Sequence, residues 1–278
     1  MILESNTLFS PTQIKNDFSK NRKLFMEFAP CCRLRQYIYC YWISPVDLSS
    51  ENNKKPDINN ELVIPDGCID ILFRINTKTK ELQVLVIGIM DAPTEVNFEY
   101  DIFQTFGIRF FPGVLYPFFK YPLNDFTNKI TLLDDVIDDV RRKLGEELIN
   151  ASTINEMVSS ADKYFSMLLN NSVYNVTLNN ALHLIYKSKG NISIKDISNS
   201  EVISERQIRR IFNNWIGINP KTFCRIVRFQ NILKNPMLSQ EINWINLSLE
   251  SGYYDQTHFI KEFKEFSGFT PDKFFEIK

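Results

Sequence analysis

Three arginines in one short segment could bind the phosphates and base edges of DNA. Arg206, Arg209 and Arg210 lie where apolar residues recur at helical spacing. The apolar stripe consists of Ile208, Ile211, Phe212 and Trp215. On a helix the three arginines and Asn213 point away from that stripe. A guanidinium can donate two hydrogen bonds to guanine O6 and N7, or it can bind a phosphate oxygen. The segment therefore predicts a helix that reads a major groove, with both modes open for each arginine.

A second segment repeats the pattern of the first at an offset of 51 residues. The repeated positions are Ser204, Phe212, Gly217, Pro220 and Phe223 in the first copy and Asp255, Phe263, Gly268, Pro271 and Phe274 in the second. Ser and Asp are good helix N-caps, and Gly suits a helix end at positive φ. A short helical segment precedes each copy, at 194–200 and 242–251. The repeat therefore predicts two helix-turn-helix units.

The second unit also presents polar side chains away from its apolar stripe. A helix over 221–235 connects the two units and would hold them in fixed register. Readers about 34 Å apart could then enter successive major grooves on one face of a duplex. The predicted DNA-binding residues are Ser204, Arg206, Gln207, Arg209, Arg210 and Asn213 in the first unit and Asp255, Gln256, Thr257, His258 and Lys261 in the second. The alternative interpretation is a helical bundle whose basic faces only meet solvent.

The charge of the chain is divided unevenly between its two parts. Residues 174–278 hold 14 Lys and Arg against 10 Asp and Glu, a net charge of +4. The totals of 32 and 33 leave 18 basic and 23 acidic residues before them, a net charge of −5. A local basic excess favours binding to a polyanion through counterion release, even in a chain whose net charge is −1.

The length of 278 residues is typical of two domains. Short apolar runs at 34–43, 61–64, 68–75, 83–89 and 103–111 predict strands. Pro65, Asp66 and Gly67 predict a turn between two of them, because Pro presets φ and Gly accepts positive φ. Helical spacing returns at 132–148 and 154–168. We expect an α+β domain over 1–173, with short antiparallel strands and two closing helices, and an all-α domain with two helix-turn-helix units over 174–278.

With these residues in place, the chain resembles the AraC/XylS family of bacterial transcription regulators. The segments that carry the resemblance are 204–212, Gly217, 220–221 and 228–230 in the first unit and 252–259, Phe263, Gly268 and 270–271 in the second. The resemblance covers about residues 178–275 and implies a seven-helix DNA-binding domain with reading helices that start near Ser204 and Asp255. The front half resembles a sensor-type domain that precedes this unit in part of the family. Its matching pieces are 41–42, 63–68, 107–110 and 112–113.

Two features depart from the family pattern. Val202 stands in the first turn, where the family often has Gly, and a β-branched residue is strained at positive φ. Ser198 and Ser248 stand where a small residue, usually Ala, packs beside each turn. The geometry of the first turn is therefore less firmly predicted than that of the second, which has Gly252.

Cysteine chemistry offers a different interpretation of the front half. Some DNA-repair proteins join a Cys-ligated zinc or alkyl-acceptor module to this type of DNA-binding unit, and Cys31, Cys32, Cys40 and Cys68 lie before residue 174. Adjacent cysteines are poor geometry for structural zinc, and Cys often packs as a small hydrophobe. The two histidines, His183 and His258, both lie in the second half. We therefore expect a regulator and not an enzyme, without a metal or a cofactor.

A small-molecule site in the front half is a further hypothesis. Aromatic residues crowd positions 98–126, and pockets are mostly apolar with a few polar anchors. The candidate ligand-binding residues are Arg109, Asp66, Phe106 and Phe110. An ordinary aromatic core or a dimer contact explains the same composition. If Arg109 is buried, it needs an internal carboxylate or an anionic effector as its partner.

The remaining expectations concern the location and partners of the protein. The sequence has no run of about 18 apolar residues, the length that a membrane-spanning helix needs. Residues 1–20 show no secretory pattern. The number of cysteines, five, is odd and therefore does not suggest a full set of disulfides. We therefore expect a cytoplasmic protein with reduced thiols. Double-stranded DNA is the expected partner. A small-molecule effector, a second copy of the chain and RNA polymerase are the other partners considered, and a DNA-binding protein without any effector stays an alternative.

Overall fold

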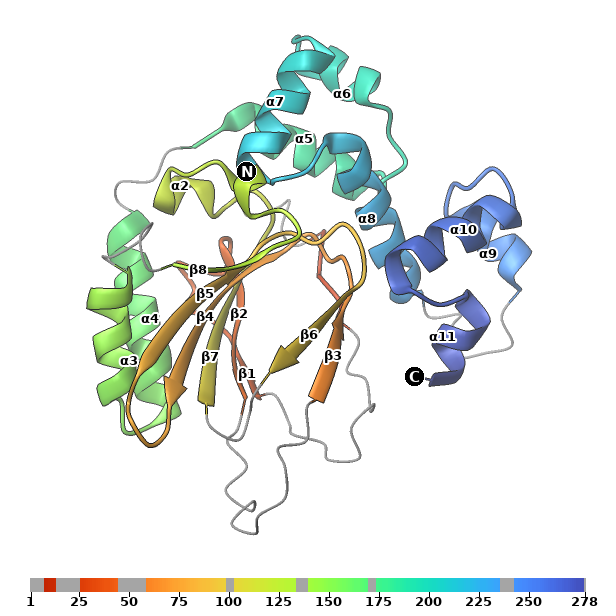
Figure 1. Cartoon of the computed structure of the whole chain (residues 1–278). Helices are drawn as coiled ribbons and strands as arrows, with labels where there is room; N and C mark the ends of the chain where they lie inside the picture. Colours follow the sequence, from red (N-terminus) through yellow and green to blue (C-terminus); the bar gives the residue numbers. More distant parts are fainter. Residues whose placement is uncertain are drawn as a thin grey trace.

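A six-stranded antiparallel sheet forms the centre of the N-terminal part (Figure 1). The computed structural model describes residues 8–13, 26–44, 59–98, 103–133, 140–169, 174–235 and 243–277. The sheet has the order β1-β2-β7-β4-β5-β8, and β3 pairs with β6 in a separate ribbon. The strands are β1 (Met26–Phe28), β2 (Ile38–Ser44), β3 (Asn59–Val63), β4 (Ile69–Asn76), β5 (Leu82–Ile87), β6 (Thr94–Phe98), β7 (Phe103–Phe110) and β8 (Ile130–Leu132).

The middle of the sheet depends on one close approach between β2 and β7. Trp42 on β2 pairs with Gly107 on β7, and a Cβ on Gly107 would lie 2.0 Å from Cε2 of the indole. Only Gly leaves room for the indole to lie against the strand at this position. The indole Nε1 donates to Asp70 of β4 at 3.3 Å, so the aromatic ring links three neighbouring strands.

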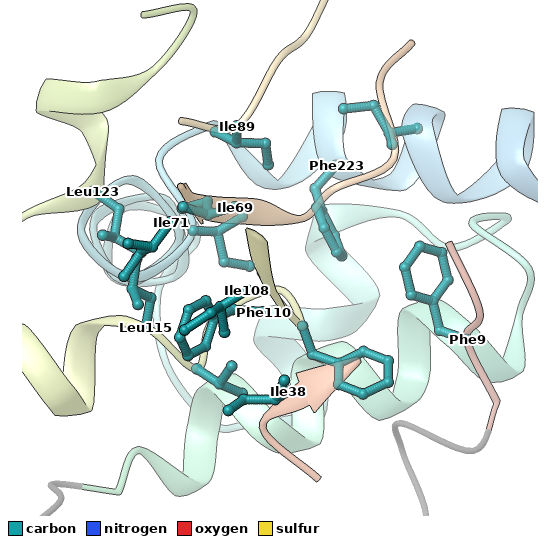
Figure 2. Packing of buried hydrophobic residues seen from close by; sticks show 14 of the residues in the cluster. Phe9, Ile38, Ile69, Ile71, Ile89, Ile108, Phe110, Leu115, Leu123 and Phe223 are labelled. Carbon is teal, nitrogen blue, oxygen red and sulfur yellow. The ribbon is translucent and has the colours of Figure 1, made fainter. Parts of the chain in front are cut away.

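Short helices cover one side of the sheet and continue the same hydrophobic core. They are α2 (Tyr116–Phe119), the 3₁₀ turn η1 (Leu123–Phe126), the π-helical turn Val140–Gly145, α3 (Glu146–Asn150) and α4 (Ile154–Leu168). Phe165 of α4 packs edge-on against Phe110 of β7, with ring centroids 5.3 Å apart. Figure 2 shows that Leu123 and Phe223, from opposite halves of the chain, belong to one cluster with Ile69.

Seven helices make up the described part of the C-terminal half, the number that the family resemblance implies. They are α5 (Val176–Lys187), α6 (Ile194–Ser200), α7 (Glu205–Trp215), α8 (Pro220–Leu233), α9 (Trp244–Glu250), α10 (Gln256–Ser267) and α11 (Pro271–Ile277). Side chains of Asn, Ser or Asp cap the start of α5 through α10, which satisfies backbone N–H groups that have no partner within the helix. None of the helices that the structure describes is long and apolar enough to cross a membrane.

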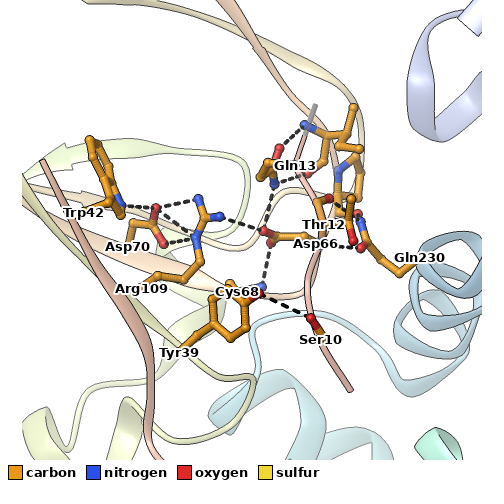
Figure 3. A network of polar contacts seen from close by, with 12 residues as sticks. Ser10, Thr12, Gln13, Tyr39, Trp42, Asp66, Cys68, Asp70, Arg109 and Gln230 are labelled. Atoms are coloured by element: carbon orange, nitrogen blue, oxygen red, sulfur yellow. Dashed lines mark hydrogen bonds and ion pairs between the residues drawn. The ribbon is translucent and has the colours of Figure 1, made fainter. Parts of the chain in front are cut away.

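The N-terminal segment (residues 8–13) lies between the two halves and binds both (Figure 3). Gln230 of α8 accepts from the Thr12 N–H at 2.7 Å and donates to the Thr12 carbonyl at 3.1 Å. The Gln13 amide forms the same kind of pair with Ile64: it donates to the Ile64 carbonyl at 2.8 Å and accepts from the Ile64 N–H at 3.1 Å. Phe9 stacks on Tyr186 of α5, with ring centroids 4.7 Å apart. Each amide side chain thus acts like the edge of a strand and pairs with a backbone donor and acceptor.

The predicted order of a strand-rich domain followed by a helical domain is confirmed, with corrections in detail. The first predicted strand corresponds to β2, which starts at Ile38 after turns at 32–37 and not at residue 34. Leu132 does not start a helix but pairs with Leu85 in β8. Strands β1, β6 and β8 have no counterpart among the predicted runs. The boundary between 173 and 174 lies at the edge of residues outside those described and stays a prediction.

Replacement of Gln230 by Ala tests the junction between the halves. The Gln230 side chain is fully buried, and it also donates to the Pro65 carbonyl at 2.8 Å. Gln230→Ala removes three hydrogen bonds and leaves buried backbone groups without partners, so we expect the free energy of unfolding to fall by about 2–3 kcal/mol. Equilibrium urea denaturation of the full chain measures this difference.

Asn231→Ala, the adjacent position on the same helix, is the matched control. Within the described part of the chain, Asn231 donates to the Val227 carbonyl of its own helix, and its loss should cost less than about 1 kcal/mol. Equal losses for the two variants would contradict a special role for the amide of Gln230.

Candidate nucleic-acid interface

The first helix-turn-helix unit consists of α6, a tight turn and α7. Ser204 caps α7, because its hydroxyl accepts from the Gln207 N–H at 3.3 Å. The Gln207 side chain accepts from the Ser204 N–H at 2.9 Å and completes a capping box. The buried face of α7 holds Ile208 and Phe212, both without solvent exposure. The opposite face therefore has a fixed direction, and it points away from the core.

The turn of the first unit has a positive φ like that of the second, although Val202 stands there and not Gly. Val202 has φ of 54°, in the left-handed region, and its side chain is 88% exposed. Gly252 of the second unit has φ of 80°, and a Cβ there would lie 2.2 Å from Asn191 Oδ1. Ser198 and Ser248 are buried beside the turns, and each hydroxyl donates to a carbonyl three residues earlier. Those hydrogen bonds satisfy each buried hydroxyl, so Ser can replace the usual Ala.

The outward face of α7 forms a cationic depression. Arg206, Arg209, Arg210 and Asn213 are exposed, and Arg209 forms an ion pair with Glu205 at 2.9 Å on the same helix. The depression has a volume of about 520 Å³. Its lining consists of Arg206, Gln207, Arg209, Arg210, Asn213 and Asn214 of the helical half together with Asn124 of η1. The predicted arginines therefore lie together, free of the core, in a surface that suits an anion.

The second unit presents a less cationic face on α10. Asp255 caps the helix and accepts from the His258 N–H at 2.7 Å. Thr257, His258 and Lys261 are exposed, and Gln256 is half-buried. The His258 ring lies edge-on to Tyr253, with ring centroids 5.3 Å apart. The predicted residues of this unit lie in the first two turns of α10 and at its N-cap, where Asp255 serves as the cap as Ser204 does in the first unit.

A buried carboxylate fixes α10 against the connecting helix α8. Glu262 is 3% exposed, and its carboxylate accepts hydrogen bonds from Arg225 Nε at 2.7 Å and from Arg228 Nη2 at 3.0 Å. The Tyr253 hydroxyl donates to the same carboxylate at 2.7 Å. Burial alone would raise the pKa of Glu262, but the hydrogen bond from Arg225 and the charge of Arg228 hold it below its usual value. The network therefore determines how α10 sits on α8.

Sequence reasoning missed Glu262 and its two arginine partners. One feature of the sequence could have pointed to this network: Glu262 is an acidic residue on the apolar stripe that Phe259, Phe263 and Phe266 form. A charge at such a position is rarely buried without a partner. The partners lie 34 and 37 residues earlier in the chain, so the spacing within α10 could not have identified them.

The candidate ligand residues Asp66 and Arg109 form an ion-pair network inside the N-terminal part (Figure 3). Arg109 donates to both oxygens of Asp70 at 2.9 Å and lies 3.6 Å from Asp66. Burial raises the pKa of Asp66, and Arg109 partly offsets that effect. Gln13 donates to the same Asp66 carboxylate at 2.7 Å. The sequence allows either an internal carboxylate or an anionic effector as the partner of a buried Arg109, and in the structure the partner is an internal carboxylate. A ligand-binding role for Asp66 and Arg109 stays a prediction.

The other two ligand candidates are packed within the core. Phe106 and Phe110 have no solvent exposure. Phe106 stacks on Tyr41, with ring centroids 5.6 Å apart, and Phe110 contacts Phe165 and Phe118. Their packing is that of ordinary core aromatics, which is the alternative that the sequence left open.

The cysteines do not gather with other metal-binding side chains within the described part of the chain. No group of three or more His, Cys, Asp or Glu side chains there could hold a metal ion. All five cysteines are free. Burial raises the pKa of the Cys40 thiol to about 12, and the pKa of Cys68 is raised for the same reason. A protonated thiol is a poor nucleophile.

Each half of the chain contains a match to a known family model. Residues 197–277 match the model described as "Helix-turn-helix domain", and residues 26–131 match "Domain of unknown function (DUF6597)". No curated protein matches. ToxT from Vibrio cholerae aligns with a TM-score of 0.41 at 12% identity, over 80% of this chain and 96% of that chain. ToxT with a bound unsaturated fatty acid aligns with a TM-score of 0.40 at 11% identity, over 79% and 91%.

The two family matches lie one in each of the two halves that the fold separates. The matched residues 197–277 include α7 and α10 with their turns. The chain therefore carries an AraC-type helix-turn-helix domain behind a domain of a family without an assigned function.

Proposed function

We propose that the chain is a sequence-specific transcription regulator that binds duplex DNA through α7 and α10. The outward face of α7 carries the proposal. Three arginines and Asn213 are exposed there, while the opposite face is buried and the first turn is capped. A guanidinium on such a helix can reach guanine O6 and N7 in the major groove or a backbone phosphate. Arg206 and Arg210 are the strongest candidates, since Arg209 is paired with Glu205.

The second reader is held to the first through α8. Phe212 of α7 contacts Phe223 near the start of α8, and Phe263 of α10 contacts Phe229. Because one continuous helix supports both readers, their spacing is set by packing and not by a flexible linker. Successive major grooves about 34 Å apart are the expected targets. Ligand binding by Asp66 and Arg109, self-association and contact with RNA polymerase remain predictions.

Arg210→Ala tests the proposal on DNA chosen by the protein itself. A cognate duplex is first selected from a pool of random-sequence duplexes by repeated rounds of binding to the full wild-type chain. A scrambled version of that duplex serves as the reference. If Arg210 binds guanine, the variant should lose about 1–3 kcal/mol on the cognate duplex alone. If Arg210 binds phosphate, both duplexes should weaken and the salt slope should fall by about one. Electrophoretic titration at two salt concentrations measures both quantities.

Lys163→Ala is the control for loss of a positive charge. Lys163 is exposed on α4, far from α7 in the fold (Figure 1), and pairs with Glu147. It should leave both titrations unchanged. An Arg210→Ala protein that binds both duplexes like the wild type would refute the assignment of α7 as a reader.

Glu262→Gln tests whether the buried carboxylate holds α10 in place. At pH 7 the variant leaves Arg225 and Arg228 without a buried counter-charge, and we expect the free energy of unfolding to fall by about 3 kcal/mol. The pKa of Glu262 is lowered by folding, so this stabilisation is present above its unfolded pKa of about 4.3. It should disappear as the pH falls through the folded pKa. Urea denaturation from pH 7 to pH 3 measures the difference.

Glu265→Gln provides the comparison on the same helix. Glu265 pairs with the same Arg225, but its side chain is 54% exposed. An exposed pair contributes at most about 1 kcal/mol. The proposed role of Glu262 is wrong if Glu262→Gln and Glu265→Gln destabilise equally, or if the loss at Glu262 is the same at every pH.

A further inference from the structure

The cationic depression on α7 is shared between the two halves of the chain. Asn124 of η1, from the strand-rich half, lines it together with Arg206, Arg210 and Asn213 of α7. Asn124 is exposed, and the lining contains no acidic side chain. A molecule that docks on the arginines of α7 therefore also meets a residue of the N-terminal part.

The N-terminal part is attached to α7 by close contacts. Thr127 donates its hydroxyl hydrogen to the Gly217 carbonyl at 2.6 Å. Gly217 has φ of 103°, and a Cβ there would lie 3.0 Å from the Leu123 carbonyl oxygen. Next to this contact, Tyr116 packs on Trp215 of α7, with ring centroids 4.5 Å apart. Backbone and aromatic contacts of this kind leave α7 and η1 little freedom to move separately.

The chemistry of the segment suits a phosphate oxygen. The Asn124 amide donates to Asp125 at 3.2 Å and keeps a second N–H, because a side-chain amide carries two donors. Lys120 and Lys129 on the same segment are exposed, and Lys129 donates to the Asp125 carbonyl at 3.0 Å. Amide and ammonium donors commonly bind the DNA backbone beside a helix that reads bases.

We propose that Asn124 is a DNA contact supplied by the N-terminal part. It donates to a phosphate at the edge of the major groove that α7 enters, so both halves of the chain recognise the first half-site. The proposal rests on the proposed function, since it requires α7 to bind DNA. The opposing arrangement, in which η1 obstructs the duplex and must move away, predicts that both changes at Asn124 tighten DNA binding.

Opposite charges at Asn124 separate the two arrangements. The full chain carrying Asn124→Asp or Asn124→Lys is titrated on the duplex selected by the wild-type protein, at several salt concentrations. Near a phosphate, Asn124→Asp should weaken binding about fivefold and Asn124→Lys should tighten it about fivefold. The salt slope of Asn124→Lys should rise by about one. Misfolding would weaken both variants, so opposite responses cannot come from a damaged fold.

Asn150→Asp and Asn150→Lys are the matched controls for charge. Asn150 is exposed at the end of α3, and its amide also donates to a nearby carbonyl of its own helix. Both should bind the duplex like the wild type.

As a test of position, the duplex is shortened on either side of the first half-site. Removal of the contacted flank should make the Asn124 variants indistinguishable, which ties the effect to one stretch of DNA.

Arg210→Ala, titrated in parallel, distinguishes failure of this inference from failure of the proposed function. Weaker binding by Arg210→Ala, with no opposite response of the Asn124 variants, overturns the contact by Asn124 and leaves the function standing. Tighter binding by both Asn124 variants overturns it in favour of obstruction. No change in Arg210→Ala on any duplex overturns the proposed function and this inference together.

Discussion

The burial of α8 is the constraint on which the arrangement of both reading helices depends. Phe223, Ile226, Val227, Phe229 and Gln230 of this helix have no solvent exposure. The helix packs against the strand-rich half near both of its ends, where a Cβ on Gly67 would lie 3.1 Å from the Phe223 ring and where Gln230 donates to the Pro65 carbonyl. It packs on α10 through Phe229. A helix enclosed in this way cannot rotate without opening cavities, so it transmits position from one half of the chain to the other.

Polar contacts then specify which of the possible packings is adopted. Hydrophobic contact is not directional, whereas the amides of Gln13 and Gln230 fit only one register of the backbone. The carboxylate of Glu262 serves α10 in the same way, because it must meet two arginines at once. The net contribution of such buried pairs to stability can be small, since desolvation opposes the attraction. Their strong geometric demands make them better at fixing an orientation than at holding a fold together.

The sequence predicts features that depend on neighbours within one or two helical turns. The caps Ser204 and Asp255 and the positive φ of Gly217 and Gly268 are of this kind, and the structure confirms them. Features that depend on distant partners were missed or wrong. Leu132 fits a helical spacing, yet it lies in β8, because pairing with β5 outweighs local periodicity. The exposure of the reading faces follows from periodicity, but the position of Asn124 beside α7 depends on residues about 90 positions apart.

The two reading helices are not equivalent in their relation to the strand-rich half. Just beyond the end of α7, the Gly217 carbonyl accepts a hydrogen bond from the Thr127 hydroxyl at the end of η1. Helix α10, in contrast, is fixed by Glu262 to α8, within its own half of the chain. A change in the N-terminal part therefore has a short route to the first reader through η1, and α8 provides a route to the second. Because coupling travels through packed elements that shift together, a response to such a change should be larger at the first half-site than at the second.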